Sequence, residues 1–195
     1  MAPTESSIQA LLTDGEIGEA TQEVLLLYGD KIYGYLVNLT HDPDLARDLF
    51  QLFSVDLWRA IERFEWRSSM KTWTFTIARR RWLQHVRSPA SQQPAQLSTR
   101  EELDLQARAR TLTLEWRKTA AHDALSAAIE DLPAQERELL NLRIAQKLEW
   151  IEIAALLHED EQPLEGDALT RASASLRKQY QRTKNKLKAQ LRPGS

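Results

Sequence analysis

Two stretches of this 195-residue chain are rich in cationic side chains, and the first of them is also rich in aromatic rings. From position 59 to 87 the acids are Glu62 and Glu65, and cations alternate with aromatic rings. The cations are Arg59, Arg63, Arg67, Lys71, Arg79, Arg80, Arg81 and Arg87, and the rings are Phe64, Trp66, Trp73, Phe75 and Trp82. Cations can follow a phosphate backbone while rings stack on unpaired bases, so the pattern indicates a groove for single-stranded nucleic acid. The alternative is an aromatic core beneath a solvated basic face.

The second stretch, residues 171–192, contains no acidic residue. Its cations are Arg171, Arg177, Lys178, Arg182, Lys184, Lys186, Lys188 and Arg192, and its apolar side is formed by Leu176, Tyr180, Thr183, Leu187 and Leu191. A short helix and a turn precede it, which is typical of the recognition helix of a helix-turn-helix unit in the major groove. The alternatives are a membrane-surface helix and a solvated basic face.

Catalytic chemistry has little support in the sequence. The histidines, His41, His85, His122 and His158, are far apart, and the chain has no cysteine, no glycine-rich phosphate loop and no nucleophile elbow. The acidic run that follows His158 could hold a metal ion, but an exposed loop explains it better. We therefore expect no enzyme, no catalytic residue, no metal site and no cofactor.

The elements that carry these residues are predicted to be all-α. Ala, Leu, Arg, Gln and Glu dominate, and hairpin signals are absent. Residues 88–100 are rich in Pro, Ser and Gln, and only a thin apolar stripe continues through residue 117. We predict two small helical domains: an N-terminal tail over 1–18, a first domain over 19–87, a flexible linker over 88–117 and a second domain over 118–192.

Apolar spacing predicts three helices in the first domain. The first spans about 19–39, with Val24, Leu27, Tyr28, Ile32, Tyr35 and Leu36 buried. The second begins near Asp42 and Pro43, with Leu45, Leu49, Phe53, Leu57, Ile61 and Phe64 along its buried stripe, broadened by Leu52 and Trp58. The third begins near Ser68 and Ser69, where a hydroxyl can cap it, and turns Met70, Trp73, Ile77 and Ala78 inward.

In the second domain we predict helices over 122–131, 134–143 and 150–157, then an acidic loop and a last helix over about 170–191.

Residues 46–87 resemble region 2 of bacterial extracytoplasmic-function (group IV) sigma factors, small members of the sigma-70 family. The most specific part reads RSSMKTWTFTIAR, residues 67–79. Two later segments resemble region 4 of the same factors: LPAQERELLNLRIAQKLEWIEIAALL, residues 132–157, and SLRKQYQRTKNKLKAQL, residues 175–191. The two matches occur in the order that this family has.

This resemblance implies a promoter-specificity subunit of RNA polymerase, with three groups of site residues. Binding of the polymerase core is implied for Asp44, Asp48, Gln51 and Asp56. Capture of the melted minus-ten element is implied for Arg63, Trp66, Arg67, Ser68, Lys71, Arg79 and Arg80. Recognition of the duplex minus-thirty-five element is implied for Arg171, Ser175, Arg177, Lys178, Gln181, Arg182 and Lys184.

The implied partners are the β′ clamp helices and β flap of the polymerase core, promoter DNA as duplex and as melted non-template strand, and an anti-sigma factor. The chain has no apolar run of about 20 residues, and residues 1–18 lack the pattern of a signal peptide. We therefore expect a cytoplasmic protein without membrane insertion.

The sequence departs from the family pattern at three places. Arg47 and Leu52 stand where the family usually has acids, and Arg80 stands where it often has Asn. The turn of the helix-turn-helix, 159–173, is long and acidic, so it either competes with DNA for the basic helix or is an inert surface loop. Two other functions stay open: a regulator that binds duplex DNA alone, and a sigma-like adaptor that forms no productive holoenzyme.

Overall fold

The computed structural model describes residues 3–87, 129, 131–158 and 164–190. The chain divides into two compact units, residues 1–119 and 120–195, and each is described by itself. Within the described residues all regular elements are helices, which confirms the predicted all-α class. The predicted linker lies outside these residues, as does most of the helix predicted over 122–131.

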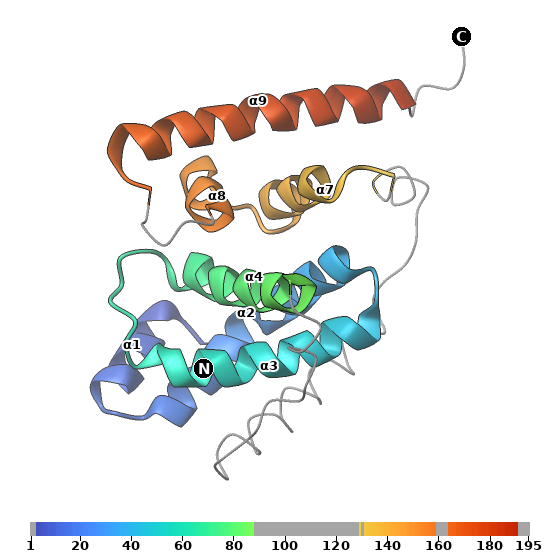
Figure 1. Ribbon diagram of the computed structural model, residues 1–195. Coiled ribbons are helices and arrows are strands. Elements are labelled where there is room, and N and C mark those ends of the chain that lie inside the picture. Colours follow the sequence, from blue (N-terminus) through green and yellow to red (C-terminus); the bar gives the residue numbers. More distant parts are fainter. Residues whose placement is uncertain (1–2, 88–128, 130, 159–163, 191–195) are drawn as a thin grey trace. The chain divides into compact units, whose positions relative to one another are not determined.

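The first unit is a bundle of α1 (Glu5–Thr13), α2 (Ile17–Thr40), α3 (Pro43–Ile61) and α4 (Met70–Arg87). Helices α2, α3 and α4 pack against one another, and α1 packs on α2 (Figure 1). Large aromatic side chains fill the core: Tyr35 and Phe75 meet edge to face with centroids 5.2 Å apart, and the centroids of Phe50 and Phe53 are 5.6 Å apart. These four rings are buried, so the bundle has a full hydrophobic core.

Helix α1 corrects the prediction of a tail over residues 1–18. A capping box between Thr4 and Ser7 starts the helix, and Ile8 is completely buried. The Tyr28 hydroxyl on α2 donates a hydrogen bond of 2.7 Å to Glu5 Oε1. Burial and this carboxylate raise the pKa of the Tyr28 phenol well above its usual value. The first helix is therefore fastened to α2 by a buried side chain and a hydrogen bond.

The start of α3 was predicted correctly. His41 adopts a left-handed conformation with φ 53° and ends α2. The Asp42 carboxylate then accepts hydrogen bonds from the backbone N–H groups of Asp44, at 2.8 Å, and Leu45, at 3.1 Å. Pro43 occupies the first turn, where its missing N–H costs nothing.

Helix α3 is buried around most of its circumference, which the sequence did not indicate. Of the predicted stripe, Leu49, Phe53, Leu57 and Ile61 are buried. Half-buried members of that set are Leu45, Leu52, Trp58 and Phe64, the last of which lies beyond the end of the helix. The adjoining positions Ala46, Phe50, Gln51, Ser54 and Val55 are buried as well. Because α3 packs between α2 and α4, one apolar stripe does not describe it.

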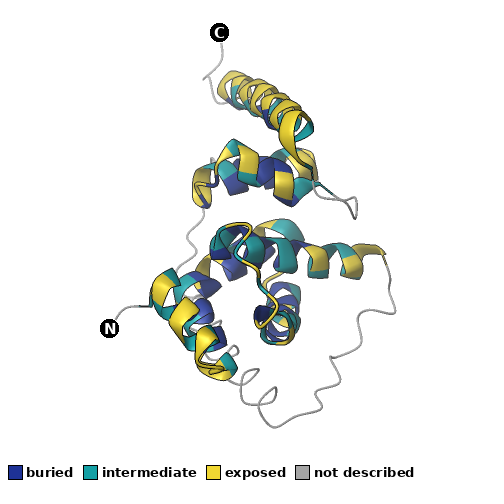
Figure 2. Ribbon diagram, turned by 90° about the vertical axis from the view of Figure 1, so that its left-hand side faces the viewer, coloured by how far each residue is buried: buried dark blue, intermediate teal, exposed yellow. Residues whose placement is uncertain are grey.

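The second unit contains α7 (Ala134–Leu140), a π-helical segment η3 (Asn141–Ala145), α8 (Trp150–Leu157) and α9 (Gly166–Gln190). Helix α9 packs against α7 and α8. Leu132, Leu140 and Leu187 form a buried cluster, against which Ile129 and Tyr180 pack. Exposed residues, yellow in Figure 2, cover most of α9, so its buried side is a narrow stripe.

Two boundaries in this unit differ from the prediction. The helix predicted over 134–143 changes to π geometry after Leu140. Helix α9 begins at Gly166, four residues before the predicted start, so residues 166–173 are helical and the acidic turn is shorter than expected. Asp167 lies in its first turn, where a carboxylate complements the helix dipole. Because residues 159–163 lie outside the described part, competition between this turn and DNA stays a prediction.

Candidate nucleic-acid interface

Three aromatic rings cluster where the loop after α3 meets α4. The centroid of Phe64 lies 4.9 Å from that of Trp66 and 4.6 Å from that of Trp73. All three residues are half-buried, so parts of the rings face solvent. Trp66 adopts φ 56°, a left-handed conformation that is rare for a bulky side chain and is found at functional sites. We call Phe64, Trp66 and Trp73 the aromatic cluster.

Trp73 corrects the prediction that this residue belongs to the core. Phe75, two residues later, is fully buried against Tyr35, whereas Trp73 lies over Phe64 at the edge of the bundle. A helix that carries rings at both positions turns them to different sides, and only one of them reaches the interior.

Most of the other residues predicted to bind the minus-ten element are exposed. Arg63, Arg67, Ser68 and Arg80 are exposed, and Lys71 is half-buried. Arg67 pairs with Glu65 at 2.8 Å, but both side chains are so exposed that the pair contributes only about 0–1 kcal/mol. DNA phosphates can therefore compete for Arg67 at little cost.

The cap of α4 fixes the geometry of this loop. The backbone N–H of Thr72 donates to Ser69 Oγ at 3.1 Å, and the two hydroxyl oxygens are 2.8 Å apart. This confirms the predicted hydroxyl cap, and it holds the end of the loop on the first turn of α4.

Arg79 differs from the other residues predicted to bind the minus-ten element. Its exposed fraction is 8%, whereas the next residue, Arg80, is exposed. Residue 79 lies on the inner side of α4 beside buried Ala78. Arg79 is thus a buried residue of the bundle, and Arg80 is the arginine of this pair that is exposed to solvent.

The residues predicted to bind the polymerase core separate into two groups. Asp44 and Asp48 expose 65% and 68% of their side chains. Arg47 lies with them, 2.9 Å from Asp44 Oδ1 and 3.8 Å from Asp48 Oδ1. We call Asp44 and Asp48 the acidic pair.

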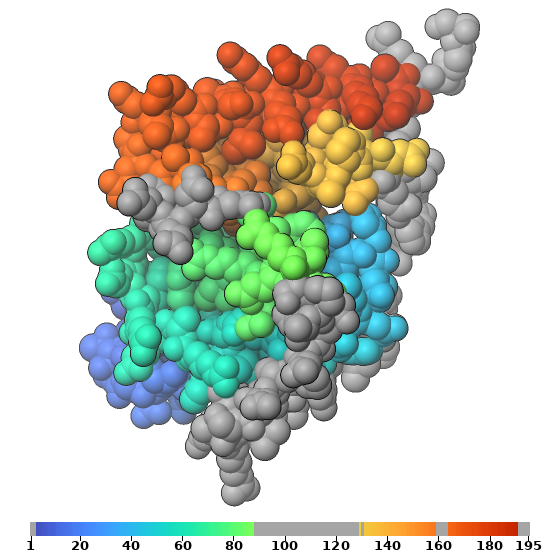
Figure 3. All heavy atoms as spheres, viewed as in Figure 1, coloured from blue at the N-terminus to red at the C-terminus, as the bar shows by residue number. Residues whose placement is uncertain are grey.

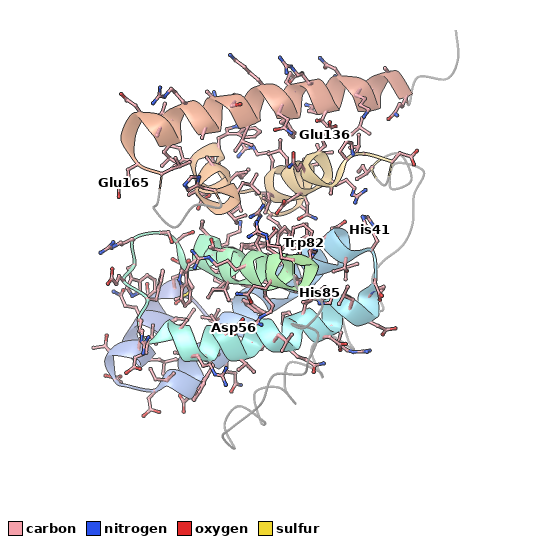
Figure 4. The ribbon with its side chains drawn as sticks, viewed as in Figure 1. His41, Asp56, Trp82, His85, Glu136 and Glu165 are labelled. Atoms are coloured by element: carbon pink, nitrogen blue, oxygen red, sulfur yellow. The ribbon has the colours of Figure 1, made fainter. Side chains whose placement is uncertain are left out.

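Gln51 and Asp56 do not share that surface. Gln51 has an exposed fraction of only 6%, because the side of α3 on which it lies is packed. Asp56 accepts a 2.7 Å hydrogen bond from Arg81 Nε and ties α3 to α4 (Figure 4). Both residues therefore take part in the packing of the bundle, and Gln51 is too buried to share an exposed face with Asp44 and Asp48. The polymerase-binding role stays a prediction.

The predicted duplex-binding residues lie along α9, and most of them are exposed. Arg171, Ser175, Arg177, Lys178, Gln181 and Arg182 are exposed, and Lys184 is half-buried beside the Tyr180 ring. Figure 3 shows α9, in orange to red, as a continuous ridge along its unit. The opposite side of α9 is anchored by buried Thr183, whose hydroxyl lies 3.1 Å from Glu136 Oε2 on α7 (Figure 4).

A shallow groove runs between α7 and α9. It is lined by Glu136, Ser175, Lys178, Gln179, Arg182 and Thr183. Its lining thus combines two cations with the Glu136 carboxylate.

Sequence reasoning missed Arg143 and Trp150 in this unit. The Arg143 guanidinium lies over the Trp150 ring, which also contacts Tyr180. The one hint in the sequence was a tryptophan, Trp150, at the start of a short predicted helix. Helical spacing does not relate Trp150 to Arg143, so the contact between them could not be predicted.

Two kinds of site are missing from the part of the chain that the structure describes. There, no cluster of three or more acidic, histidine or cysteine residues could hold a metal ion. No helix of that part is both long and apolar enough to cross a bilayer.

Comparison with known proteins gives one family match, within the first unit, and two distant relatives. The family described as Sigma-70 region 2 matches residues 24–91. The chain is 27% identical over 139 residues to the RNA polymerase sigma factor YlaC of Bacillus subtilis (strain 168), covering 71% of this chain and 80% of YlaC. It is 23% identical over 163 residues to the ECF RNA polymerase sigma factor SigM of the same organism, covering 84% of this chain and 96% of SigM. An alignment of that length extends beyond the first unit.

Proposed function

We propose that this chain, an extracytoplasmic-function sigma factor of the sigma-70 family, melts promoter DNA with its first unit and binds promoter duplex with its second. As a sigma factor it directs RNA polymerase to promoters for the initiation of transcription. The polymerase performs the covalent chemistry, in the cytoplasm. The contribution of this chain is binding energy that favours separated strands over paired ones.

The aromatic cluster is the observation that carries the melting proposal. Phe64, Trp66 and Trp73 present half-exposed rings next to the cations Arg63 and Arg67. Stacking of one unpaired base on an aromatic side chain contributes about 1–3 kcal/mol, which can offset the cost of unstacking it from the duplex. A regulator that binds only duplex DNA has no use for exposed rings in this position.

The acidic pair supports a role in binding the polymerase core. Asp44 and Asp48 are exposed carboxylates on one side of α3, and they can steer and contact a basic partner. We assign to them the contact with the β′ clamp helices, and to the second unit the contact with the β flap. We assign no residue to an anti-sigma factor.

The outer side of α9 supports binding of duplex DNA. A ridge with Arg171, Arg177, Lys178 and Arg182 exposed fits the phosphates and the major groove, while Thr183 and Leu187 hold the helix to its unit. We assign this helix to the minus-thirty-five element.

In vitro transcription tests this function. Core polymerase is mixed with the full chain and fragmented genomic DNA of the source organism, and RNA 5′ ends are mapped. We expect discrete start sites that share an upstream motif and that core polymerase alone does not use. If the chain binds core polymerase and DNA but yields no start site, it is an adaptor. If it binds duplex without binding core polymerase, it is a regulator.

A further inference from the structure

Trp150, the first residue of α8, is contacted by side chains from two other elements. The guanidinium carbon of Arg143, on η3, lies 5.0 Å from the centroid of the indole ring. That of Arg177, on α9, lies 5.9 Å from it. Tyr180 meets the indole edge to face, with centroids 5.2 Å apart. Residues that are far apart in the sequence therefore converge on one ring.

The Arg143 side of this arrangement is fixed by several contacts. Arg143 Nη1 donates a 2.7 Å hydrogen bond to the backbone carbonyl of Leu148 and lies 3.4 Å from Glu149 Oε1. Glu149 and Glu152 form a capping box that starts α8 at Trp150. The indole thus projects from a turn whose backbone and neighbouring cation are both held in place.

Arg177 differs from Arg143 because it lies on the exposed side of α9. A long side chain on an exposed helix surface samples many rotamers and loses that freedom when it binds a phosphate. The negative face of an indole attracts a guanidinium, and this attraction reduces the number of rotamers that the arginine samples in the absence of DNA. Lys178, the next residue, lines the groove beside Glu136 instead, so the two neighbouring cations have different surroundings.

We propose that Trp150 is a positioning residue for DNA binding: its indole face holds the Arg177 guanidinium in place on the DNA-facing side of α9. This inference rests on the proposed function of α9 and identifies a residue outside that helix on which its affinity depends. Trp150 itself need not touch DNA.

A double-mutant cycle tests the proposal with the full chain and a mixed-sequence duplex of about 20 base pairs, which accommodates one recognition helix in a major groove. Affinity is measured by fluorescence anisotropy for Trp150→Leu, Arg177→Gln and the double variant. Trp150→Leu is expected to weaken binding about two- to fivefold, the range that one exposed cation–π contact supports. In the Arg177→Gln background it is expected to have no further effect. In the matched Lys178→Gln background its effect is expected to remain complete.

A second readout needs no DNA. The Nε–Hε resonance of Arg177 is expected to shift when Trp150→Leu removes the ring, while circular dichroism stays unchanged. If Trp150→Leu does not fold, Trp150→Phe keeps a ring with a weaker negative face and supports the same cycle with a smaller coupling.

The outcomes separate this inference from the proposed function. If Trp150→Leu lowers DNA affinity equally in the wild-type and Arg177→Gln backgrounds, the ring acts through packing. That result would overturn the positioning role of Trp150 but not the proposed function of α9. An unmoved Arg177 resonance would do the same. If the wild-type chain does not bind the duplex at all, the proposed function of α9 fails and the positioning role fails with it.

Discussion

Arg47 partly neutralises the acidic pair to which we assign polymerase binding. Its guanidinium lies 2.9 Å from Asp44 and 3.8 Å from Asp48, and both carboxylates are mostly exposed. A basic partner that approaches this surface meets a cation among the acids. The position of Arg47 therefore lowers the attraction that the two carboxylates would exert alone.

We expect Arg47→Ala to raise the affinity for core polymerase about two- to fivefold, since an exposed ion pair competes by only about 0.5–1 kcal/mol. Asp48→Arg, which replaces one carboxylate of the acidic pair with a cation, should lower that affinity. Titration of labelled core polymerase with each variant measures both changes. Unchanged binding by both variants would remove this surface from the interface.

Tyr28 gives a pH prediction at the same scale. The pKa of its phenol is raised by burial and by the Glu5 carboxylate, so the folded state favours the protonated hydroxyl. The resulting stabilisation is complete below the ordinary pKa of 10.0 and is lost as the pH rises above it.

Tyr28→Phe should therefore be less stable than the wild type at about pH 9, and the difference should narrow by about pH 11. Urea denaturation at both pH values measures it. A difference that is the same at both would contradict the role of the Tyr28 hydroxyl.

Single residues show what could be predicted from sequence and what could not. The exposure of Asp44, Asp48 and Arg80 followed from charge and helical spacing. The burial of Gln51 and Arg79 did not, because it depends on how closely α3 and α4 are packed by their neighbours. The type of a residue indicates how unfavourable its burial is. The sequence does not show which polar residues find partners inside the bundle that compensate for that burial.

At the scale of elements, the Asp56–Arg81 pair joins α3 to α4. The Asp56 side chain is 27% exposed and that of Arg81 is 23% exposed, so the pair is more shielded than the pairs on the acidic surface. Removing one partner leaves a half-buried charge without its counter-ion.

Asp56→Ala should lower the free energy of unfolding by about 1–2 kcal/mol, whereas Asp48→Ala should change it by less than about 0.5 kcal/mol. The affinity for core polymerase should fall in Asp48→Ala and change little in Asp56→Ala. Urea denaturation and the polymerase titration together test this assignment. A stable Asp56→Ala chain that no longer binds polymerase would restore Asp56 to the interface.

Substitutions of two aromatic residues of α4, Trp73 and Phe75, should have different effects on stability. Phe75→Ala creates a cavity in the core and should cost about 3–5 kcal/mol. Trp73→Ala should cost less, because part of its ring faces solvent, and should instead reduce DNA opening. Denaturation midpoints of the two variants provide the comparison. A larger loss of stability from Trp73→Ala would mean that the aromatic cluster belongs to the core.

Helix existence could be predicted where apolar spacing was dense, as in α2, α3 and α8. Helix α1 was missed because its buried side is a single residue, Ile8, and a tertiary hydrogen bond to Tyr28 completes its anchoring. The start of α9 was placed late because acidic residues around Gly166 indicated a loop. The same carboxylates also favour the first turn of a helix.

For the whole molecule, the division into two helical units followed from composition, since a stretch without apolar periodicity separates two dense ones. The motif of residues 67–79 lies inside the segment that matches the Sigma-70 region 2 family, whereas the motifs of the second unit lie outside that match. The sequence indicated which residues form the aromatic cluster, but it did not predict how their rings are placed relative to one another. Its half-exposed geometry depends on the Trp66 backbone and the Ser69 cap.

Permanganate oxidation of unpaired thymines on a promoter mapped by transcription tests most directly whether the first unit opens DNA. With core polymerase and the wild-type chain, thymines upstream of the start site should become reactive. Trp66→Ala should reduce that reactivity while polymerase binding persists, and Leu26→Ala, which removes an exposed apolar side chain from α2, should leave it unchanged. A second variant replaces all three rings of the aromatic cluster. If thymine reactivity stays at the wild-type level in this variant and in Trp66→Ala, the aromatic cluster does not open promoter DNA.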